Sequence, residues 1–126
     1  FVDDTNSSDS QIAEAIGNAG QYANFVFSSA GIEPAALDEE AVAHLKAKGL
    51  DISSNITKSI GHIPNLEHYQ VIVALSKKGI QAFPPPPTRT VGIRWKIKDT
   101  NLEEKHEFLS EQIQDLAQAI LGEQKK

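Results

Sequence analysis

The stretch that decides the fold stands at the start of the chain and reads Phe1-Val2-Asp3-Asp4-Thr5-Asn6-Ser7-Ser8-Asp9-Ser10-Gln11-Ile12-Ala13-Glu14-Ala15-Ile16. Phe1-Val2 is typical of the end of a strand, and we expect the start of that strand to precede the chain. The polar residues 3–9 are typical of a turn. Apolar residues at helical spacing follow, and Gly17 and Gly20 are suited to end that helix. The stretch therefore predicts a strand, a polar loop and a helix in direct succession.

Further strands and helices alternate along the rest of the chain. Short apolar runs predict strands at 25–28, 71–75 and 91–97. The run at 71–75 is rich in β-branched residues, which suits a buried parallel strand, whereas 91–97 alternates and suits an edge. Asp38 can cap a second helix that ends at Gly49 and buries an apolar face formed by Ala41, Val42 and Leu45.

A long helix is predicted at the end of the chain. Thr100 and Glu103 form a capping-box pattern. The helix that follows carries one apolar stripe, made of Leu102, Leu109, Ile113, Leu116 and Ile120. Alternating strands and helices predict a three-layer α/β domain with a four-stranded parallel sheet and helices on both faces.

Length and composition narrow the classes of function. The 126 residues, 13.7 kDa in mass, suit one domain spanning 1–126. A net charge of −5 argues against binding to a nucleic-acid backbone. The absence of cysteine excludes disulfides, thiolate metal sites and a cysteine nucleophile. No apolar run approaches the ~20 residues of a membrane span, and no signal peptide is evident, so we expect a cytoplasmic domain without membrane insertion. Nothing in the sequence indicates a cofactor.

The loop from Asp3 to Ser10 is the candidate site. In an open parallel sheet, ligands bind at the carboxyl ends of the strands beside a topological switch point. A loop that joins the first strand to a helix N-terminus at that place normally binds an anion, because backbone N–H groups and the helix dipole point at it.

At this point the sequence resembles a known family. The resemblance rests on Asn6–Ala15, Ser29-Ala30-Gly31 with Pro34, Lys48–Ser53, Tyr69–Leu75, and Arg94-Trp95 followed by Asp99. These segments, in this order, are similar to low-molecular-weight protein tyrosine phosphatases and thioredoxin-coupled arsenate reductases. The resemblance implies the phosphotyrosine phosphatase I-like fold with a flavodoxin-like strand order.

The residues that carry the family's chemistry are replaced in this chain. The family pattern of Cys, five residues, Arg and Ser implies that Asp3 stands at the cysteine position and Asp9 at the arginine position. Ser10 and the loop-shaping Asn6 are kept, and Asp99 stands where the general acid is expected. The two further cysteines of the reductases correspond to positions near Ser76 and Phe83.

Acidic residues therefore line a loop that the family uses for oxyanions. The loop comprises Asp3, Asp4, Thr5, Asn6, Ser7, Ser8, Asp9 and Ser10. A unit-charge pair at ~4 Å interacts by roughly 4 kcal/mol at an effective dielectric of about 20. Repulsion of this size exceeds what a helix terminus supplies, so we predict that the loop holds no phosphate dianion. We expect a catalytically degenerate domain that acts as a regulatory or interaction module, with an unknown protein or a tethered neighbouring domain as partner.

Other interpretations stay open at this stage. Asp3, Asp4 and Asp9, with Asp99, offer hard oxygen ligands to Mg²⁺ or Ca²⁺. Alternatively, Asp9 caps the first helix while Asp3 and Asp4 are solvated. A residual phosphatase-type hydrolase would use Asp3 and Asp99. Asp3 and Asp4 also resemble the acidic pair of a phosphoacceptor receiver domain, although no later strand ends in the Asp that such a domain phosphorylates.

The histidines are scattered, and we expect two of them, His44 and His106, to face water on their helices.

Overall fold

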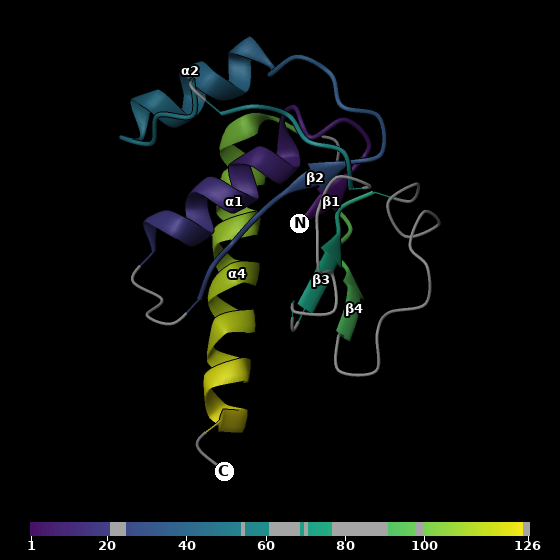
Figure 1. Ribbon diagram of the computed structural model, residues 1–126. Coiled ribbons are helices and arrows are strands. Elements are labelled where there is room, and N and C mark those ends of the chain that lie inside the picture. The colour runs from purple at the N-terminus through teal and green to yellow at the C-terminus, as the bar shows by residue number, and fades with distance from the viewer. Residues whose placement is uncertain are drawn as a thin grey trace.

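A parallel sheet of four strands forms the centre of the molecule (Figure 1). The computed structural model describes residues 1–20, 25–53, 55–60, 69, 71–76, 91–97 and 100–124. The strands are β1 (Val2–Asp3), β2 (Ala30–Gly31), β3 (Val71–Ala74) and β4 (Val91–Arg94). Their order is β2-β1-β3-β4, and every neighbouring pair is parallel. The α/β fold class and the flavodoxin-like order are therefore confirmed, and β4 lies at an edge as expected.

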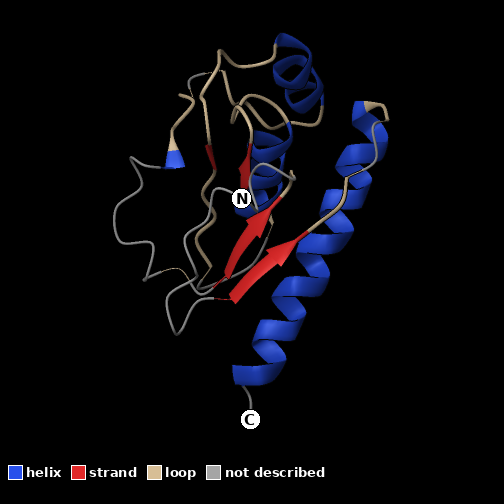
Figure 2. Cartoon of the chain, turned by 90° about the vertical axis from the view of Figure 1, so that its right-hand side faces the viewer, coloured by secondary structure: helices blue, strands red, loops and turns tan. Residues whose placement is uncertain are grey.

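In the described part of the chain, the sheet is accompanied by the helices α1 (Asp9–Ala19), α2 (Glu39–Ala47) and α4 (Leu102–Gln124). α1 and α4 pack against each other along the sheet, while α2 lies beyond the carboxyl ends of the strands (Figures 1 and 2). None of the helices in the described part of the chain is both long and apolar enough to cross a membrane.

The core lies between the sheet and the α1–α4 pair. Ile12 of α1 and Leu109 and Ile113 of α4 are fully buried. They pack with Val73 of β3 and with Trp95, which follows β4. Burial of each large aliphatic side chain contributes about 1.5–3 kcal/mol, so this cluster fixes how both helices sit on the sheet. The apolar stripe predicted for the last helix is thereby confirmed at Leu102, Leu109, Ile113 and Leu116.

The strand predicted at 25–28 is wrong. Residues 25–29 form no strand, β2 begins only at Ala30, and Val26 is 87% exposed. The side chain of Asn18 explains the difference, because its Oδ1 accepts from the Phe27 N–H and its Nδ2 donates to the Phe27 carbonyl, both at 3.1 Å. These bonds occupy the backbone groups that a neighbouring strand would need.

Two helix ends also differ from expectation. α1 continues through Gly17 and ends before Gly20. A Cβ at position 17 would lie 2.5 Å from the ring of Phe27, so this glycine serves close packing rather than termination. At the start of α4, the Glu104 N–H donates to Asn101 Oδ1 at 2.9 Å, so Asn101 caps the helix in place of Thr100.

The second helix follows its prediction. The side chain of Asp38 accepts from the Glu40 N–H at 3.2 Å, and Ala41 and Leu45 are fully buried. Gly49, with φ of 84°, stands two residues after the last helical residue.

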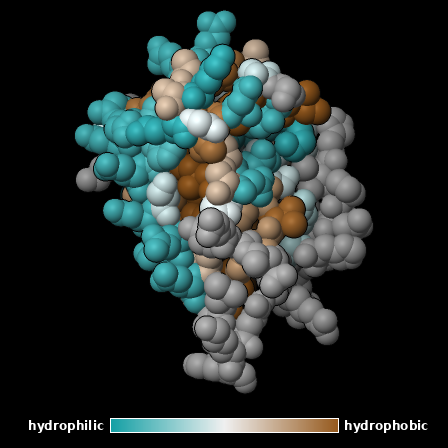
Figure 3. Space-filling view, turned by 90° about the vertical axis from the view of Figure 1, so that its left-hand side faces the viewer, coloured by the Kyte–Doolittle hydropathy of each residue, from teal (hydrophilic) through white to brown (hydrophobic). Residues whose placement is uncertain are grey.

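The face seen in Figure 3 is largely hydrophilic, with a smaller apolar patch near its middle.

Candidate functional site

The loop from Asp4 to Ser8 joins the carboxyl end of β1 to the first turn of α1. β1 has β2 on one side and β3 on the other, so the chain leaves the sheet here at the point where its connections change direction. This is where ligands bind in open α/β sheets. The sequence-based placement of the candidate site is therefore in agreement with the fold.

The carboxylate of Asp3 lies inside this loop. Its Oδ1 accepts from the Asn6 N–H at 2.7 Å, and its Oδ2 accepts from the Ser10 N–H at 3.1 Å. Asp3 is only 8% exposed, so the expectation that it is solvated is wrong. Backbone N–H groups at a helix start favour an anion, and here a side chain of the same chain supplies it.

Two opposing effects act on the acidity of Asp3. Burial raises the pKa of its carboxyl above the ordinary value, because the charged form loses hydration. The hydrogen bonds from Asn6 and Ser10 act the other way and favour the carboxylate, whereas the nearby charge of Asp9 adds to the rise. The pKa of Asp3 is raised overall, so the charged form of this buried carboxyl lowers the stability of the folded chain.

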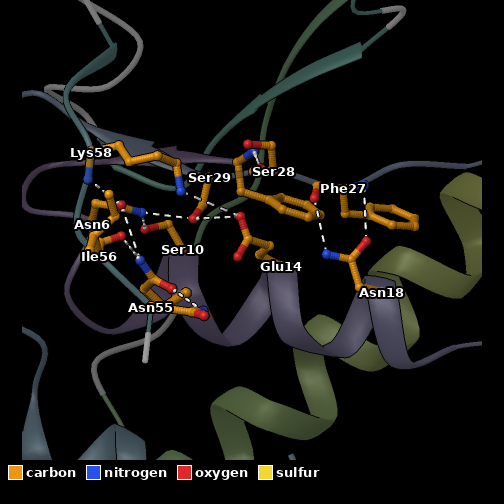
Figure 4. Close-up of polar contacts among 12 residues, drawn as sticks. Asn6, Ser10, Glu14, Asn18, Phe27, Ser28, Ser29, Asn55, Ile56 and Lys58 are labelled. Carbon is orange, nitrogen blue, oxygen red and sulfur yellow. Dashed lines mark hydrogen bonds and ion pairs between the residues drawn. The ribbon is translucent and has the colours of Figure 1, made fainter. Parts of the chain in front are cut away.

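Asn6 holds the loop in shape from its centre (Figure 4). Its Nδ2 donates to the hydroxyl oxygens of Ser10 and Ser29, each at 2.9 Å. Its Oδ1 accepts from the Lys58 N–H at 2.8 Å and from Gln11 Nε2 at 3.1 Å. The residue is fully buried and has φ of 53°, a left-handed conformation that asparagine tolerates better than most residues. The loop-shaping role expected for Asn6 agrees with these contacts.

A further set of polar residues supports this centre, and the sequence alone did not reveal it (Figure 4). Asn55 Nδ2 donates to Gln11 Oε1 at 3.0 Å. Glu14 Oε1 accepts from the Ser29 hydroxyl at 3.2 Å and lies 3.8 Å from Lys58 Nζ. The one hint in the sequence was Gln11, which stands next to Ile12 on α1. Its side chain is fully buried, and a buried polar side chain needs hydrogen-bond partners.

The chain after β2 lies against the loop and fixes its far side. A Cβ on Gly31 would lie 2.6 Å from the Asn6 nitrogen and 2.7 Å from the Thr5 carbonyl carbon, so only glycine allows this approach. Beyond Gly31, successive amides donate to the loop carbonyls at 2.8–3.1 Å, in the pairs Ile32–Asp3, Glu33–Asp4, Ala35–Thr5 and Asp38–Ser7. The segment that leads into α2 is thus bonded along the loop.

Asp9 pairs with a lysine of the last helix. It is the first residue of α1, and its Oδ1 lies 3.4 Å from Lys105 Nζ of α4. The alternative in which Asp9 caps α1 is not what the structure has, because the Asp3 carboxylate bonds the Ser10 N–H. Ser8 stands at the N-cap but makes no capping bond from its side chain to the described amides of α1. Lys105 is a site residue that sequence reasoning missed, since it comes from the far end of the chain.

The remaining residues predicted for the site either lie in the loop or fall outside the described part of the chain. Thr5 and Ser7 share a hydrogen bond of 2.6 Å between their hydroxyls, whereas Asp4 Oδ1 is buried and accepts no bond from the described residues. Phe83 and Asp99 lie outside the described residues. In the described ranges, no three His, Cys, Asp or Glu side chains are grouped to hold a metal ion. The arrangement offers a buried carboxylate and a buried hydroxyl at Ser10, and no thiol.

Comparison with known proteins agrees with this geometry. The family model described as low molecular weight phosphotyrosine protein phosphatase matches residues 1–118. A glutaredoxin arsenate reductase of Synechocystis sp. is 27% identical over 99 residues, which cover 79% of this chain and 75% of that protein.

Solved structures show the same similarity. An arsenate reductase in the phosphate binding state is 26% identical, with a TM-score of 0.79 and 95% of each chain covered. An arginine phosphatase from Geobacillus stearothermophilus has a TM-score of 0.78 over 98% of this chain and 92% of its own, and at 20% identity it supports the fold alone. With its family model matched over residues 1–118, the chain belongs to the low molecular weight phosphotyrosine protein phosphatase family.

Proposed function

We propose that this chain is a non-catalytic member of its family, in which the Asp3 carboxylate closes the oxyanion loop and the domain serves as a regulatory or interaction module. The observation that carries the proposal is the pair of bonds at 2.7 and 3.1 Å from the Asn6 and Ser10 amides to the Asp3 carboxylate. A bound oxyanion would need the same two amides. These two amides are therefore satisfied without a ligand.

The residues at the cysteine and arginine positions of the family pattern cannot perform the reaction either. The chain has no cysteine, so no thiolate can attack a phosphoryl group or an arsenate. Asp9, at the arginine position that the resemblance implies, carries the opposite charge and pairs with Lys105. A carboxylate lacks the planar fork of N–H donors with which arginine grips an oxyanion. The Ser10 hydroxyl accepts a bond from Asn6 and is fully buried, which does not suit a nucleophile.

The direct test is an activity assay with p-nitrophenyl phosphate at acidic and neutral pH, together with an arsenate reduction assay. We expect no turnover above buffer. The Asp3→Cys/Asp9→Arg double variant is the matched reference, because it restores the family residues on the same scaffold. Turnover by the wild-type chain would contradict the proposal.

A divalent cation in the loop is a second candidate, favoured by one observation. Asp4 Oδ1 is buried without a hydrogen bond from the described residues, and such an oxygen could bind Mg²⁺ or Ca²⁺. Against it, the oxygens of Asp3 face amides and Asp9 faces Lys105. A rise in unfolding temperature with millimolar Mg²⁺ or Ca²⁺, lost in Asp4→Asn, would support this candidate over the closed loop. A residual hydrolase that uses Asp3 and Asp99 would instead be detected by the phosphatase assay.

The partner in this proposal is a protein or a neighbouring domain, in a cytoplasmic setting. The net charge of −5 disfavours nucleic acid. Affinity capture followed by a measured dissociation constant for a purified candidate would identify such a partner.

A further inference from the structure

The first turns of α4 contact α2 through two imidazole rings. His44 Nε2 lies 3.1 Å from His106 Nδ1, and the ring centroids are 5.1 Å apart at an interplanar angle of 64°. The side chain of His44 is only 12% exposed, so the expectation that both histidines face water is wrong. A hydrogen bond between two ring nitrogens needs one donor and one acceptor, so at least one ring must be neutral for the contact to form.

Charged groups from both helices surround this pair. Lys48, at the C-cap of α2, has its Nζ 2.6 Å from Glu103 Oε1 of α4. Glu103 Oε2 is 4.0 Å from His44 Nδ1, and Glu107 also faces His106. In the described ranges no three His, Cys, Asp or Glu side chains are grouped to hold a metal ion. Protonation of both rings would place two N–H groups against each other and add positive charge beside Lys48.

We propose that His44 and His106 form a pH-sensitive clasp between α2 and α4, closed while at least one ring is neutral and opened when both are protonated. The clasp is distinct from the oxyanion loop and does not depend on whether the loop is catalytic. It lies close to that loop in structure, however, because Lys105, the residue before His106, bonds Asp9 at the start of α1.

Opening of the clasp has a path to the loop. α2 continues directly from the segment 32–38, whose amides donate to the loop carbonyls of residues 3, 4, 5 and 7. On this proposal, release of α2 from α4 loosens the chain that lies along the loop, while the bonds from the Asn6 and Ser10 amides to the Asp3 carboxylate remain. We expect the amides of Glu33, Ala35 and Asp38 to be the first to lose protection from hydrogen exchange when the clasp opens.

The direction of the pH effect follows from the surroundings of His106. Burial lowers its pKa below the ordinary 6.5, and the charges of His44 and Lys48 lower it further, while Glu103 and Glu107 act in the opposite direction. A base with a depressed pKa binds fewer protons in the native state than in the unfolded state. Its contribution to stability is therefore present above 6.5 and is lost as the pH falls below that value.

The test compares wild type, His44→Gln and His106→Gln by urea unfolding and by NMR at about pH 7.5 and about pH 5.5. Lys46→Gln, which removes a positive charge from an exposed position of α2, is the matched control. We expect the urea midpoint of wild type and of the control to fall on acidification, and that of each histidine variant to fall less. Protection of the Glu33, Ala35 and Asp38 amides should drop by roughly tenfold in wild type and in the control, and less in either histidine variant.

A second measurement keeps the proposal open to refutation if a histidine variant folds poorly. Lys48→Met removes a charge from an exposed residue, and it should raise the pH at which the His106 ring titrates by NMR. His44→Gln should raise it as well. Equal acid sensitivity in wild type and both histidine variants would overturn the clasp, and so would a His106 titration that neither change moves.

Discussion

Replacing Asp3 with serine should turn the closed loop into an oxyanion site. In the native chain the Asp3 carboxylate accepts from the Asn6 and Ser10 amides at 2.7 and 3.1 Å. Serine is too short to fill both places and carries no charge. The Asn6 side chain keeps its four other bonds in the variant, to Ser10, Ser29, Gln11 and Lys58. We therefore expect the Asp3→Ser variant to keep the loop shape and to bind phosphate or tungstate.

The size of the effect follows from the charge that is removed. An oxyanion bound to the same amides would sit within ~4 Å of the native carboxylate, where each unit of charge is repelled by roughly 4 kcal/mol at an effective dielectric of about 20. That energy corresponds to a factor of about a thousand in dissociation constant for each unit of ligand charge. The second acidic charge, on Asp9, stays but is partly balanced by Lys105 at 3.4 Å. We expect affinity in the millimolar range in the variant and none measurable in wild type.

The assay is isothermal titration with phosphate and tungstate at constant ionic strength, supported by the shift in unfolding temperature. Asp115→Ser, at an exposed position of α4, makes the same change of charge away from the loop and should bind nothing. Asp3→Asn keeps the volume of the side chain but can accept from only one of the two amides, because its Nδ2 is a donor, so it should bind the anions more weakly than Asp3→Ser. The reasoning is refuted if wild type binds the anions as well as Asp3→Ser does, or if a folded Asp3→Ser fails to bind them.

Three further predictions concern the scaffold of the loop and its pH dependence. Asn6→Ala removes the partner of four groups around a fully buried position, so the free energy of unfolding should fall by about 3 kcal/mol or more in urea titration; a loss near zero would contradict the central role of Asn6. Gly31→Ala places a Cβ 2.6 Å from the Asn6 nitrogen, so it should destabilise the chain by about 2 kcal/mol, and an unchanged urea midpoint would show that β2 can move away from the loop. The raised pKa of Asp3 means that its contribution to stability is present below the ordinary 3.8 and is lost as the pH rises through its native pKa. Wild type should therefore gain stability relative to Asp3→Ser as the pH falls toward 3.8, which parallel unfolding curves would measure, and a constant difference would argue against a buried carboxylate.

The sequence was sufficient where a local pattern decides the structure. The apolar stripe of α4 and the Asp38 cap of α2 are local signals, and the structure follows both. The strand expected at 25–28 failed because the Asn18 side chain takes the backbone bonds of Phe27 from nine positions away. Propensity and periodicity carry no information about such a competitor.

The candidate site was located from the sequence, but its internal arrangement was not. The polar run after β1 was enough to place the loop at the carboxyl edge of the sheet. Whether Asp3 points to water or to the loop amides depends on a backbone conformation, set by Asn6 at φ of 53°, that a residue list does not specify. The contacts of Asp9 with Lys105 and of His44 with His106 join residues 96 and 62 positions apart, so they follow only from the packing of α4.

An oxyanion loop that is filled by its own carboxylate responds differently to its surroundings. A loop that needs a bound anion gains stability from that anion by mass action, whereas this loop has its Asn6 and Ser10 amides satisfied in every molecule. On our proposal, the oxyanion concentration therefore does not change the conformation of the loop. Contacts on the first turns of α4 join it to both other helices, because Lys105 bonds α1 and His106 bonds α2. Our two proposals together describe a family scaffold whose conformation is controlled by protonation of His44 and His106, and not by the binding of an oxyanion.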